Sequence, residues 1–221
     1  MTAEYQKFTR DFRKNFNRYT RRAFQLIPKI DRPRILDIGC GSGVPIFELA
    51  NLSDGKIIGI DIEQPLLNIV NELVEKRGLS SRIKIINCSL FNINFPNDYF
   101  DILWSEGSIN IIGFERGLKE WKRLLKQEGY LVIHDESKDL QNKIDQISKL
   151  GYKLIEYFQL PKDAWWLEYY GHMENKLKNL YKNDETHQSL LKVIKRCEIE
   201  IKDYKRSPDN FNSAFFVLKK L

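Results

Sequence analysis

The sequence predicts an α/β fold in which helices cover both faces of an open, mostly parallel sheet. Short apolar runs alternate with longer amphipathic stretches between residues 34 and 134, a pattern that joins parallel strands through right-handed helical crossovers. A glycine-rich turn follows the first apolar run, and an aspartate ends the second. The chain has 221 residues, 42% of them hydrophobic, which suffices for one core, so we expect a single domain over residues 1–221.

The chain opens with an aromatic and basic stretch over residues 4–27. Its rings recur every three to five residues between Lys and Arg side chains, which predicts an amphipathic helix. Pro28 and Pro33 end this pattern. Residues 1–34 hold ten Lys and Arg against three Asp and Glu. Such a charge can follow phosphates, but it is more typical of a solvated helix face.

Residues 34–160 carry the predicted sheet core. We expect five strands in its first part, at residues 34–38, 56–60, 82–86, 100–104 and 130–134. Helices fall between them, at residues 45–50, 66–77 and 114–125. A sixth strand fits residues 152–160, and a seventh, antiparallel strand fits residues 213–218 in the last segment, 211–221. Between these two strands, residues 161–210 have helical patterning, which predicts a helical insert at the sheet edge.

Composition excludes several protein classes. No stretch approaches the ~20 apolar residues that cross a bilayer, and the polar N-terminus has no apolar signal core. Cys40, Cys88 and Cys197 are too few and too scattered for a disulfide framework, and no His and Cys cluster has metal-ligand spacing. We therefore expect a soluble, cytoplasmic protein with reduced thiols and no metal.

The glycine-rich turn, residues 37–43, lies between a strand and a helix. Glycines there permit positive φ and let a ligand approach the backbone, and the helix N-terminus behind them offers unpaired N–H groups. The pattern is G-x-G-x-G, ending at Gly43, whereas the dinucleotide fingerprint needs a glycine at the position of Val44. Asp61 ends the second strand, where a carboxylate can bind both ribose hydroxyls. The spacing disfavours NAD and FAD but favours a nucleoside ligand.

These residues resemble a known family. Residues 35–43 resemble the first motif of class I S-adenosylmethionine-dependent methyltransferases, especially the small-molecule, type 11, ubiquinone-biosynthesis-like branch. Residues 95–101 resemble that branch's entry into its fourth strand, and residues 117–126 resemble its helix before the fifth strand. The resemblance runs from Arg34 to about His134 and implies a Rossmann-like fold with seven strands.

The resemblance also implies the cofactor, S-adenosylmethionine, with S-adenosylhomocysteine as product. Asp37, together with the turn residues Gly39, Cys40, Gly41 and Gly43, would contact its methionyl part, Asp61 its ribose and Ile62 its adenine. Ser89 stands where the family often has an aspartate for the adenine amino group, beside Leu90, and it substitutes weakly. Trp104 completes the expected cofactor contacts. A second departure, at residues 126–129, falls in a remote turn.

The methyl acceptor should bind beyond the ends of the fourth and fifth strands. That position holds Glu106, Asn110 and His134. Glu106 is our first candidate to orient or deprotonate the acceptor, and His134 is the second because its ordinary pKa of about 6.5 suits proton transfer near neutrality. Either side chain has the alternative role of holding a loop.

An aromatic segment, residues 164–173, supplies further acceptor candidates. At helical spacing, Trp165, Tyr169 and His172 share one face, while Trp166, Tyr170 and Met173 share another. The first face suits an aromatic wall for a flat ring or an amine, and burial in the core is an equal alternative. For Trp166 and Tyr170 we favour the core.

The leading function is methylation of a small organic acceptor. The alternatives are an RNA or protein methyltransferase, favoured by the basic N-terminus, and a non-catalytic binder of the cofactor. We do not expect a nucleic-acid partner, because residues 104–107 lack the Asn/Asp-Pro-Pro-aromatic motif of base-amine methyltransferases and no RNA-binding module is recognisable. By family analogy, residues 1–30 form a lid, with Arg18 and Tyr19 near the cofactor carboxylate. A monomer and a homodimer are both compatible with the sequence.

Overall fold

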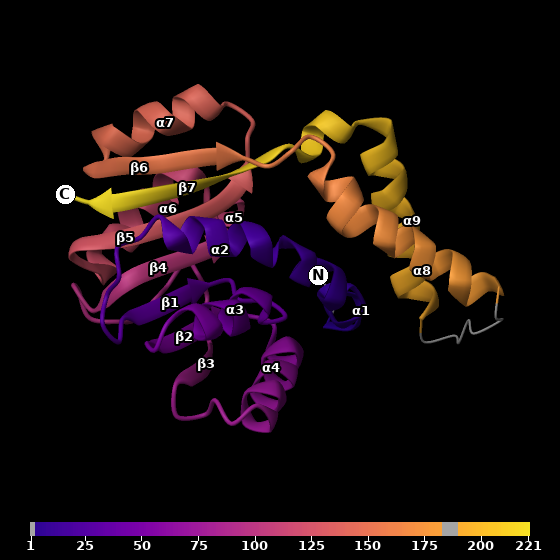
Figure 1. Ribbon diagram of the computed structural model, residues 1–221, viewed down its shortest axis with the longest axis horizontal. Coiled ribbons are helices and arrows are strands. Elements are labelled where there is room, and N and C mark those ends of the chain that lie inside the picture. Colours follow the sequence, from indigo (N-terminus) through magenta and orange to yellow (C-terminus); the bar gives the residue numbers. More distant parts are fainter. Residues whose placement is uncertain (1–2, 183–189) are drawn as a thin grey trace.

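A seven-stranded sheet forms the centre of the computed structural model, which describes residues 3–182 and 190–221 (Figure 1). Its strands lie in the order β3-β2-β1-β4-β5-β7-β6. Only β7 is antiparallel to its neighbours, β5 and β6. The bounds are β1 Arg34–Ile38, β2 Lys56–Asp61, β3 Ile83–Asn87, β4 Phe100–Glu106, β5 Leu125–Glu136, β6 Tyr152–Gln159 and β7 Ser213–Lys220. The predicted fold class is confirmed.

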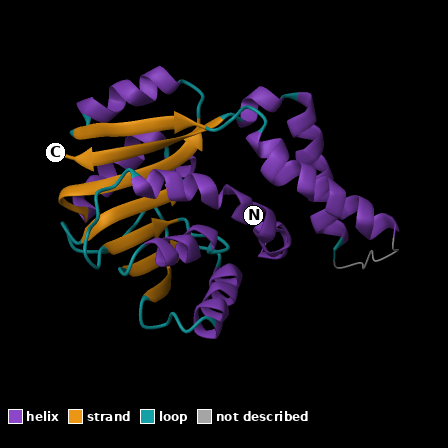
Figure 2. Ribbon diagram, viewed as in Figure 1, coloured by secondary structure: helices purple, strands orange, loops and turns teal. Residues whose placement is uncertain are grey.

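Helices cover both faces of this sheet (Figure 2). One buried cluster includes Ile35 and Ile102 and packs against α2, α3 and α4; the other includes Leu36 and Leu103 and packs against α5, α6 and α7. Alternate strand residues point to opposite faces, so each strand contributes side chains to both clusters. The bounds are α1 Ala3–Arg13, α2 Asn17–Gln25, α3 Val44–Leu52, α4 Gln64–Lys76, α5 Ile109–Ile112, α6 Phe114–Trp121, α7 Leu140–Lys149, α8 Gly171–Lys182 and α9 Leu191–Arg206. No helix within the described ranges is long and apolar enough to span a membrane.

The N-terminal stretch differs from the single helix that its periodicity predicts. A 3-10 turn, Lys14–Phe16, separates α1 from α2, and the Phe16 side chain is buried there. Helix α2 lies over the sheet, whereas α1 continues past the strand ends toward the insert (Figure 1). The break arises because Phe16 packs against Trp165, a contact distant in sequence.

Strand β5 also differs, because it begins at Leu125 rather than at Tyr130. The predicted turn at Glu128 and Gly129 is a bulge within this strand, with Glu128 at a φ of +66°. Phe100 pairs with Leu125, and pairing resumes only at Ile102 and Tyr130. Helices α5 and α7 were not predicted. Helix α5 is short, and in α7 most residues are polar, so the helical spacing of its apolar residues is weak.

Residues between β6 and β7 form the helical insert that the sequence predicts. It contains a π-helical turn, Trp166–Tyr170, then α8 and α9, and a 3-10 turn, Pro208–Phe211. The insert follows the carboxyl end of β6, and α1 lies between it and the sheet (Figure 1). Part of this region, residues 183–189, lies outside the described residues.

Candidate functional site

A cavity of about 730 Å³ lies where the parallel strands end, within the ~300–1000 Å³ typical of small-molecule sites. Turns after the strands, helix α1 and the insert enclose it. Its glycine-turn end is formed by the described residues 39–42, 60–63 and 88–91. Its insert end is formed by Trp165, Tyr169, Tyr170, Arg196, Glu200, Asp203 and Phe211. Glu106, the last residue of β4, and Ser108, just after it, also line the cavity.

The glycine turn has the conformation that only glycine adopts freely. Gly39, Gly41 and Gly43 have φ of +76°, +49° and +75°. A Cβ on Gly39 would lie 2.4 Å from the Cβ of Ser108. The N–H groups of Gly39 and Cys40 both donate to Ile60 O at 2.9 Å, which ties the turn to β2. These two hydrogen bonds therefore fix the backbone of the turn beside the end of β2, at the wall of the cavity.

Asp61 is the last residue of β2 and faces this turn. Its Oδ2 accepts the Gly41 N–H at 2.9 Å, and its Oδ1 accepts the Glu63 N–H at 3.0 Å. Each carboxylate oxygen can accept a further hydrogen bond. The carboxylate is thus fixed at the cavity wall with free lone pairs, as a ribose site requires.

An apolar rim continues from Asp61. The side chain of Ile62 is 63% exposed, and Ile62, Ser89 and Leu90 all line the cavity as expected for an adenine site. The Ser89 hydroxyl accepts the Phe91 N–H at 3.3 Å, so it caps its own turn. Phe91 lines the cavity as well and was not predicted.

Asp37 lies behind the glycine turn and does not itself line the cavity. Its side chain is buried, and its Oδ2 has no hydrogen-bond partner among the described residues. Burial raises the pKa of Asp37 well above its usual range, and the charges of Glu106 and Asp61 raise it further. A buried carboxylate oxygen without a partner is costly, so this position suits a donor or a cation from a ligand.

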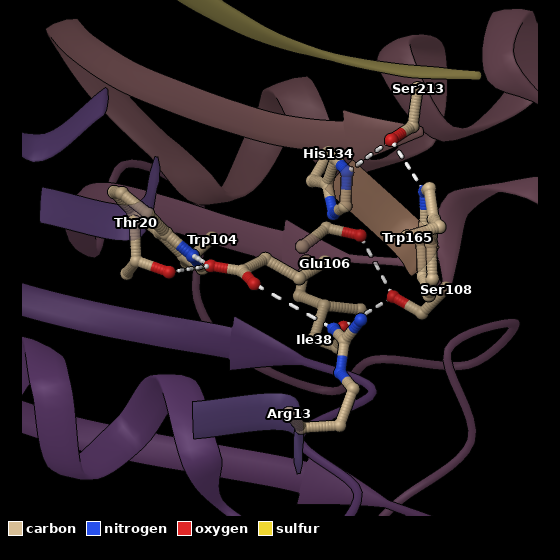
Figure 3. A network of polar contacts seen from close by, with 10 residues as sticks. Arg13, Thr20, Ile38, Trp104, Glu106, Ser108, His134, Trp165 and Ser213 are labelled. Carbon is tan, nitrogen blue, oxygen red and sulfur yellow. Dashed lines mark hydrogen bonds and ion pairs between the residues drawn. The ribbon is translucent and has the colours of Figure 1, made fainter. Parts of the chain in front are cut away.

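Glu106 ends β4 and is held by three side chains (Figure 3). Its Oε1 accepts hydrogen bonds of 2.8 Å from Thr20 Oγ1 and from Trp104 Nε1. Its Oε2 lies 3.8 Å from the guanidinium of Arg13. Burial raises the pKa of Glu106, while Arg13 opposes that rise. One carboxylate oxygen is therefore saturated, and the other faces Arg13.

Trp104 does not reach the cavity, contrary to the predicted cofactor contact. It is fully buried and packs near Phe24 of α2, with ring centroids 6.2 Å apart. Strand alternation turns its side chain onto the face that α2 covers. Trp104 acts on the site only through its hydrogen bond to Glu106.

His134 is not a cavity residue either. Its Nε2 lies 3.0 Å from Ser213 Oγ, and its ring stacks on Phe215 at 4.4 Å. Burial lowers the pKa of His134 to about 3, with Arg13 adding to the effect. The imidazole is neutral near pH 7 and supports Trp165, whose Nε1 donates to the same Ser213 hydroxyl (Figure 3). The predicted proton-transfer role has no support in this geometry.

Asn110 is exposed on α5, and it also lies outside the cavity wall.

The aromatic segment lines the cavity with a different set of rings from the predicted one. Trp165 and Tyr169 contribute as predicted, and Tyr170 joins them, whereas His172 instead stacks near Phe12 at 6.4 Å. The reason is the π-helical turn, whose wider period brings adjacent residues toward one side. Trp166 stacks on Tyr204 of α9 and so packs with the core, which is the placement we favoured for it.

Helix α1 closes the cavity, but through residues other than those predicted. Arg18 pairs with Glu168 at 2.7 Å, and neither Arg18 nor Tyr19 lines the cavity. The lining residues are Tyr5, Gln6, Thr9 and Arg13, all on α1. The spacing of these residues by about four positions is visible in the sequence as a helical pattern. The sequence does not show that the helix ends at Arg13.

Across the described ranges, no three His, Cys, Asp or Glu side chains come together to hold a metal ion.

Comparison with known proteins supports this geometry. Residues 36–133 match the family model described as methyltransferase domain. The core of the chain is thus similar to class I methyltransferases. The matched segment begins within β1 and ends within β5, and so includes the glycine turn, Asp61 and Glu106.

Individual relatives are similar over part of their length. The chain is 31% identical over 117 residues to the demethylmenaquinone methyltransferase of Bacteroides fragilis, covering 52% of this chain and 48% of that protein. The chain spans less than half the length of the curated relatives it matches.

Solved structures share the fold over almost the whole chain. A methyltransferase from Thiobacillus denitrificans, solved with S-adenosylhomocysteine, has a TM-score of 0.71 at 17% identity and covers 92% of this chain and 91% of its own. The [4+2]-cyclase SpnF has a TM-score of 0.74 at 18% identity, with coverage of 92% and 81%. A methyltransferase fold is thus also found in a protein named as a cyclase.

Proposed function

We propose that the protein is an enzyme that binds S-adenosylmethionine and transfers its methyl group to a small organic molecule. The observation that carries the proposal is the unpartnered Oδ2 of Asp37 directly behind the glycine turn. The cofactor's amino acid part carries an ammonium group, which satisfies a buried carboxylate of this kind. The neighbouring Asp61 carboxylate, open to two ribose hydroxyls, supports the same ligand.

The residues at the glycine-turn end fit the cofactor part by part. Asp37 and the turn, residues 39–43, would hold its methionyl group, Asp61 its ribose, and Ile62 with Leu90 its adenine. S-adenosylmethionine, when bound, supplies a methyl group on a sulfonium, whose leaving group needs no activation. The protein's contribution is then mainly to position the acceptor and exclude water. Glu106 can hold a proton at Oε2, the oxygen that faces Arg13.

The shape of the insert end supports a small acceptor. Trp165, Tyr169 and Tyr170 line a cavity of about 730 Å³, which is of small-molecule size. The relatives include proteins named as demethylmenaquinone and sterol methyltransferases. A cytoplasmic location belongs to the same proposal, because the three cysteines are free thiols.

Two other functions remain as candidates with specific support. The basic N-terminal segment favours an RNA or protein acceptor. The fold shared with a protein named as a [4+2]-cyclase favours a function other than methyl transfer, and the candidate of that class is a non-catalytic binder of the cofactor. Steep salt dependence of tRNA binding would favour the first. Tight cofactor binding without transfer to any acceptor would favour the second.

The deciding experiment is calorimetric titration of the purified protein with S-adenosylhomocysteine, followed by incubation with methyl-labelled S-adenosylmethionine and fractionated small-molecule extract. We expect saturable binding to one site and label in a small, protease-resistant and nuclease-resistant product. No binding of S-adenosylhomocysteine contradicts the cofactor assignment. Label found in RNA or protein contradicts the acceptor class.

A further inference from the structure

Helix α1 presents two stripes of side chains to two different parts of the site. Gln6 and Arg10 face the glycine turn: a Cβ on Gly41 would lie 2.9 Å from Gln6 Oε1, and Arg10 Nε donates to Ser42 O at 3.0 Å. Tyr5, Thr9 and Arg13 follow at i, i+4 and i+8, which places them together on an adjacent stripe. The Tyr5 hydroxyl lies 3.2 Å from the Tyr169 hydroxyl, so this second stripe faces the insert.

Arg13 therefore belongs to the insert end rather than to the glycine turn. Its guanidinium lies 5.7 Å from the ring centroid of Trp165 and 5.3 Å from that of Phe16. Its charge also contributes to the lowered pKa of His134, near the end of β5. The charges that act on Asp37, behind the turn, are instead those of Glu106 and Asp61.

The guanidinium of Arg13 is held in position, but its hydrogen-bond donors have no partners among the described residues. Its closest oppositely charged atom is Glu106 Oε2 at 3.8 Å, too far for a hydrogen bond, and it donates none to the part of the chain that the structure describes. Its Cζ lies over the rings of Phe16 and Trp165, and cation–π contacts of this kind use none of its N–H donors. The side chain is 23% exposed and lines the cavity.

We infer that Arg13 anchors the methyl acceptor by donating hydrogen bonds to an oxyanion that the acceptor carries on or beside a flat ring. A planar guanidinium matches an oxyanion with two parallel hydrogen bonds, which an ammonium does not. The ring of the acceptor packs against Trp165 and Tyr169. The acceptor class is thus an acidic aromatic or enolic molecule. This inference rests on the proposed function, because it places the acceptor beside the cofactor.

The test uses the full chain saturated with S-adenosylhomocysteine and measures the added shift in Tm from simple ring compounds. Benzoate, salicylate and 4-hydroxybenzoate are the oxyanion probes, and benzamide and benzylamine are the matched neutral and cationic probes. We expect the oxyanions alone to stabilise the wild-type complex. Arg13→Met should weaken apparent oxyanion affinity by roughly tenfold or more, and Arg13→Lys should be intermediate.

Two control variants separate this role from general effects. Lys7→Met removes one positive charge from an exposed position of the same helix, away from the cavity, and should retain the oxyanion response. Arg13→Met leaves Glu106 without its cation, so the double variant Arg13→Met/Glu106→Gln is measured as well; it should fold and still lack the response.

The inference is overturned if benzylamine stabilises the wild-type complex more than benzoate does, if no oxyanion does so, or if Lys7→Met loses the response equally. It is also overturned if Arg13→Met weakens binding of S-adenosylhomocysteine itself about tenfold, since Arg13 would then serve the cofactor. Failure of the proposed function is a different result, namely no binding of S-adenosylhomocysteine by the wild-type protein.

Discussion

The indole nitrogen of Trp165 donates a hydrogen bond of 3.0 Å to the hydroxyl of Ser213, which joins the start of the insert to the start of β7. Replacing Trp165 with Ala should therefore impair methyl transfer to the acceptor and leave the affinity for S-adenosylhomocysteine unchanged. Trp165→Phe, which keeps a ring but loses the hydrogen bond, should be less impaired. Steady-state kinetics and calorimetry check this. Global unfolding of both variants would mean that Trp165 is a core residue.

Asp61 should account for most of the cofactor affinity. Asp61→Ala removes the hydroxyl acceptor and also releases the N–H groups of Gly41 and Glu63. We expect the rise in Tm caused by S-adenosylhomocysteine to disappear largely in this variant. Glu63→Ala, at a neighbouring cavity position, is the control and should retain it. Equal shifts in Asp61→Ala and the wild type would contradict the ribose assignment.

These two predictions differ in how much of their basis was visible in the sequence. Gly39, Gly41 and Asp61 lie at or directly after predicted strand ends, so local patterns bring them to the cavity, whereas Gly43 does not line it. Arg13 and Tyr170 were missed, because their positions depend on a 3-10 break and a π-helical turn. Those irregularities are set by packing between distant segments, such as Phe16 on Trp165, which periodicity does not record.

Asp37 should destabilise the ligand-free protein as the pH rises. Because its pKa is higher in the folded than in the unfolded state, the unfolded chain loses this proton first, and stability falls above the ordinary pKa of about 4. Asp37→Asn should raise the Tm of the ligand-free protein near pH 8, by about 2–4 °C per kcal/mol relieved, and have little effect near pH 4. Differential scanning calorimetry across this range measures it. A constant difference at all pH values would argue against titration of Asp37.

His134 should oppose that trend at acid pH. Its pKa of about 3 in the folded state is below the ordinary value of about 6.5, so the unfolded state takes up the proton first. Its contribution to stability is present above about pH 6.5 and is lost as the pH falls toward 3. His134→Phe should flatten the acid limb of the stability profile, whereas Ser213→Ala, which keeps the imidazole, should not. An imidazole resonance of His134 that titrates between pH 5 and 8 by NMR would contradict the placement.

Two glycines with similar φ should respond differently to alanine. Gly39 and Gly107 have φ of +76° and +71°, so both substitutions cost the ~1 kcal/mol or more of a left-handed residue. Only at Gly39 would the new Cβ meet a neighbour, at 2.4 Å from Ser108 Cβ, while Gly107 has open space within 4 Å. Gly39→Ala should therefore lower the free energy of unfolding more than Gly107→Ala. Chemical denaturation measures both, and equal losses would exclude a steric contribution.

The two ends of the insert meet at one place in the sheet, where the Leu160 N–H donates to Ser213 O at 2.9 Å and β6 pairs directly with β7. The segment between them is thus an excursion from a single pair of neighbouring strands. An evolving or engineered protein can exchange such a segment as a cassette, because the order of the strands and the nucleoside-binding turns lie outside it. Chimaeras that swap residues 161–210 among related proteins would then redirect the choice of acceptor while inheriting the same donor chemistry.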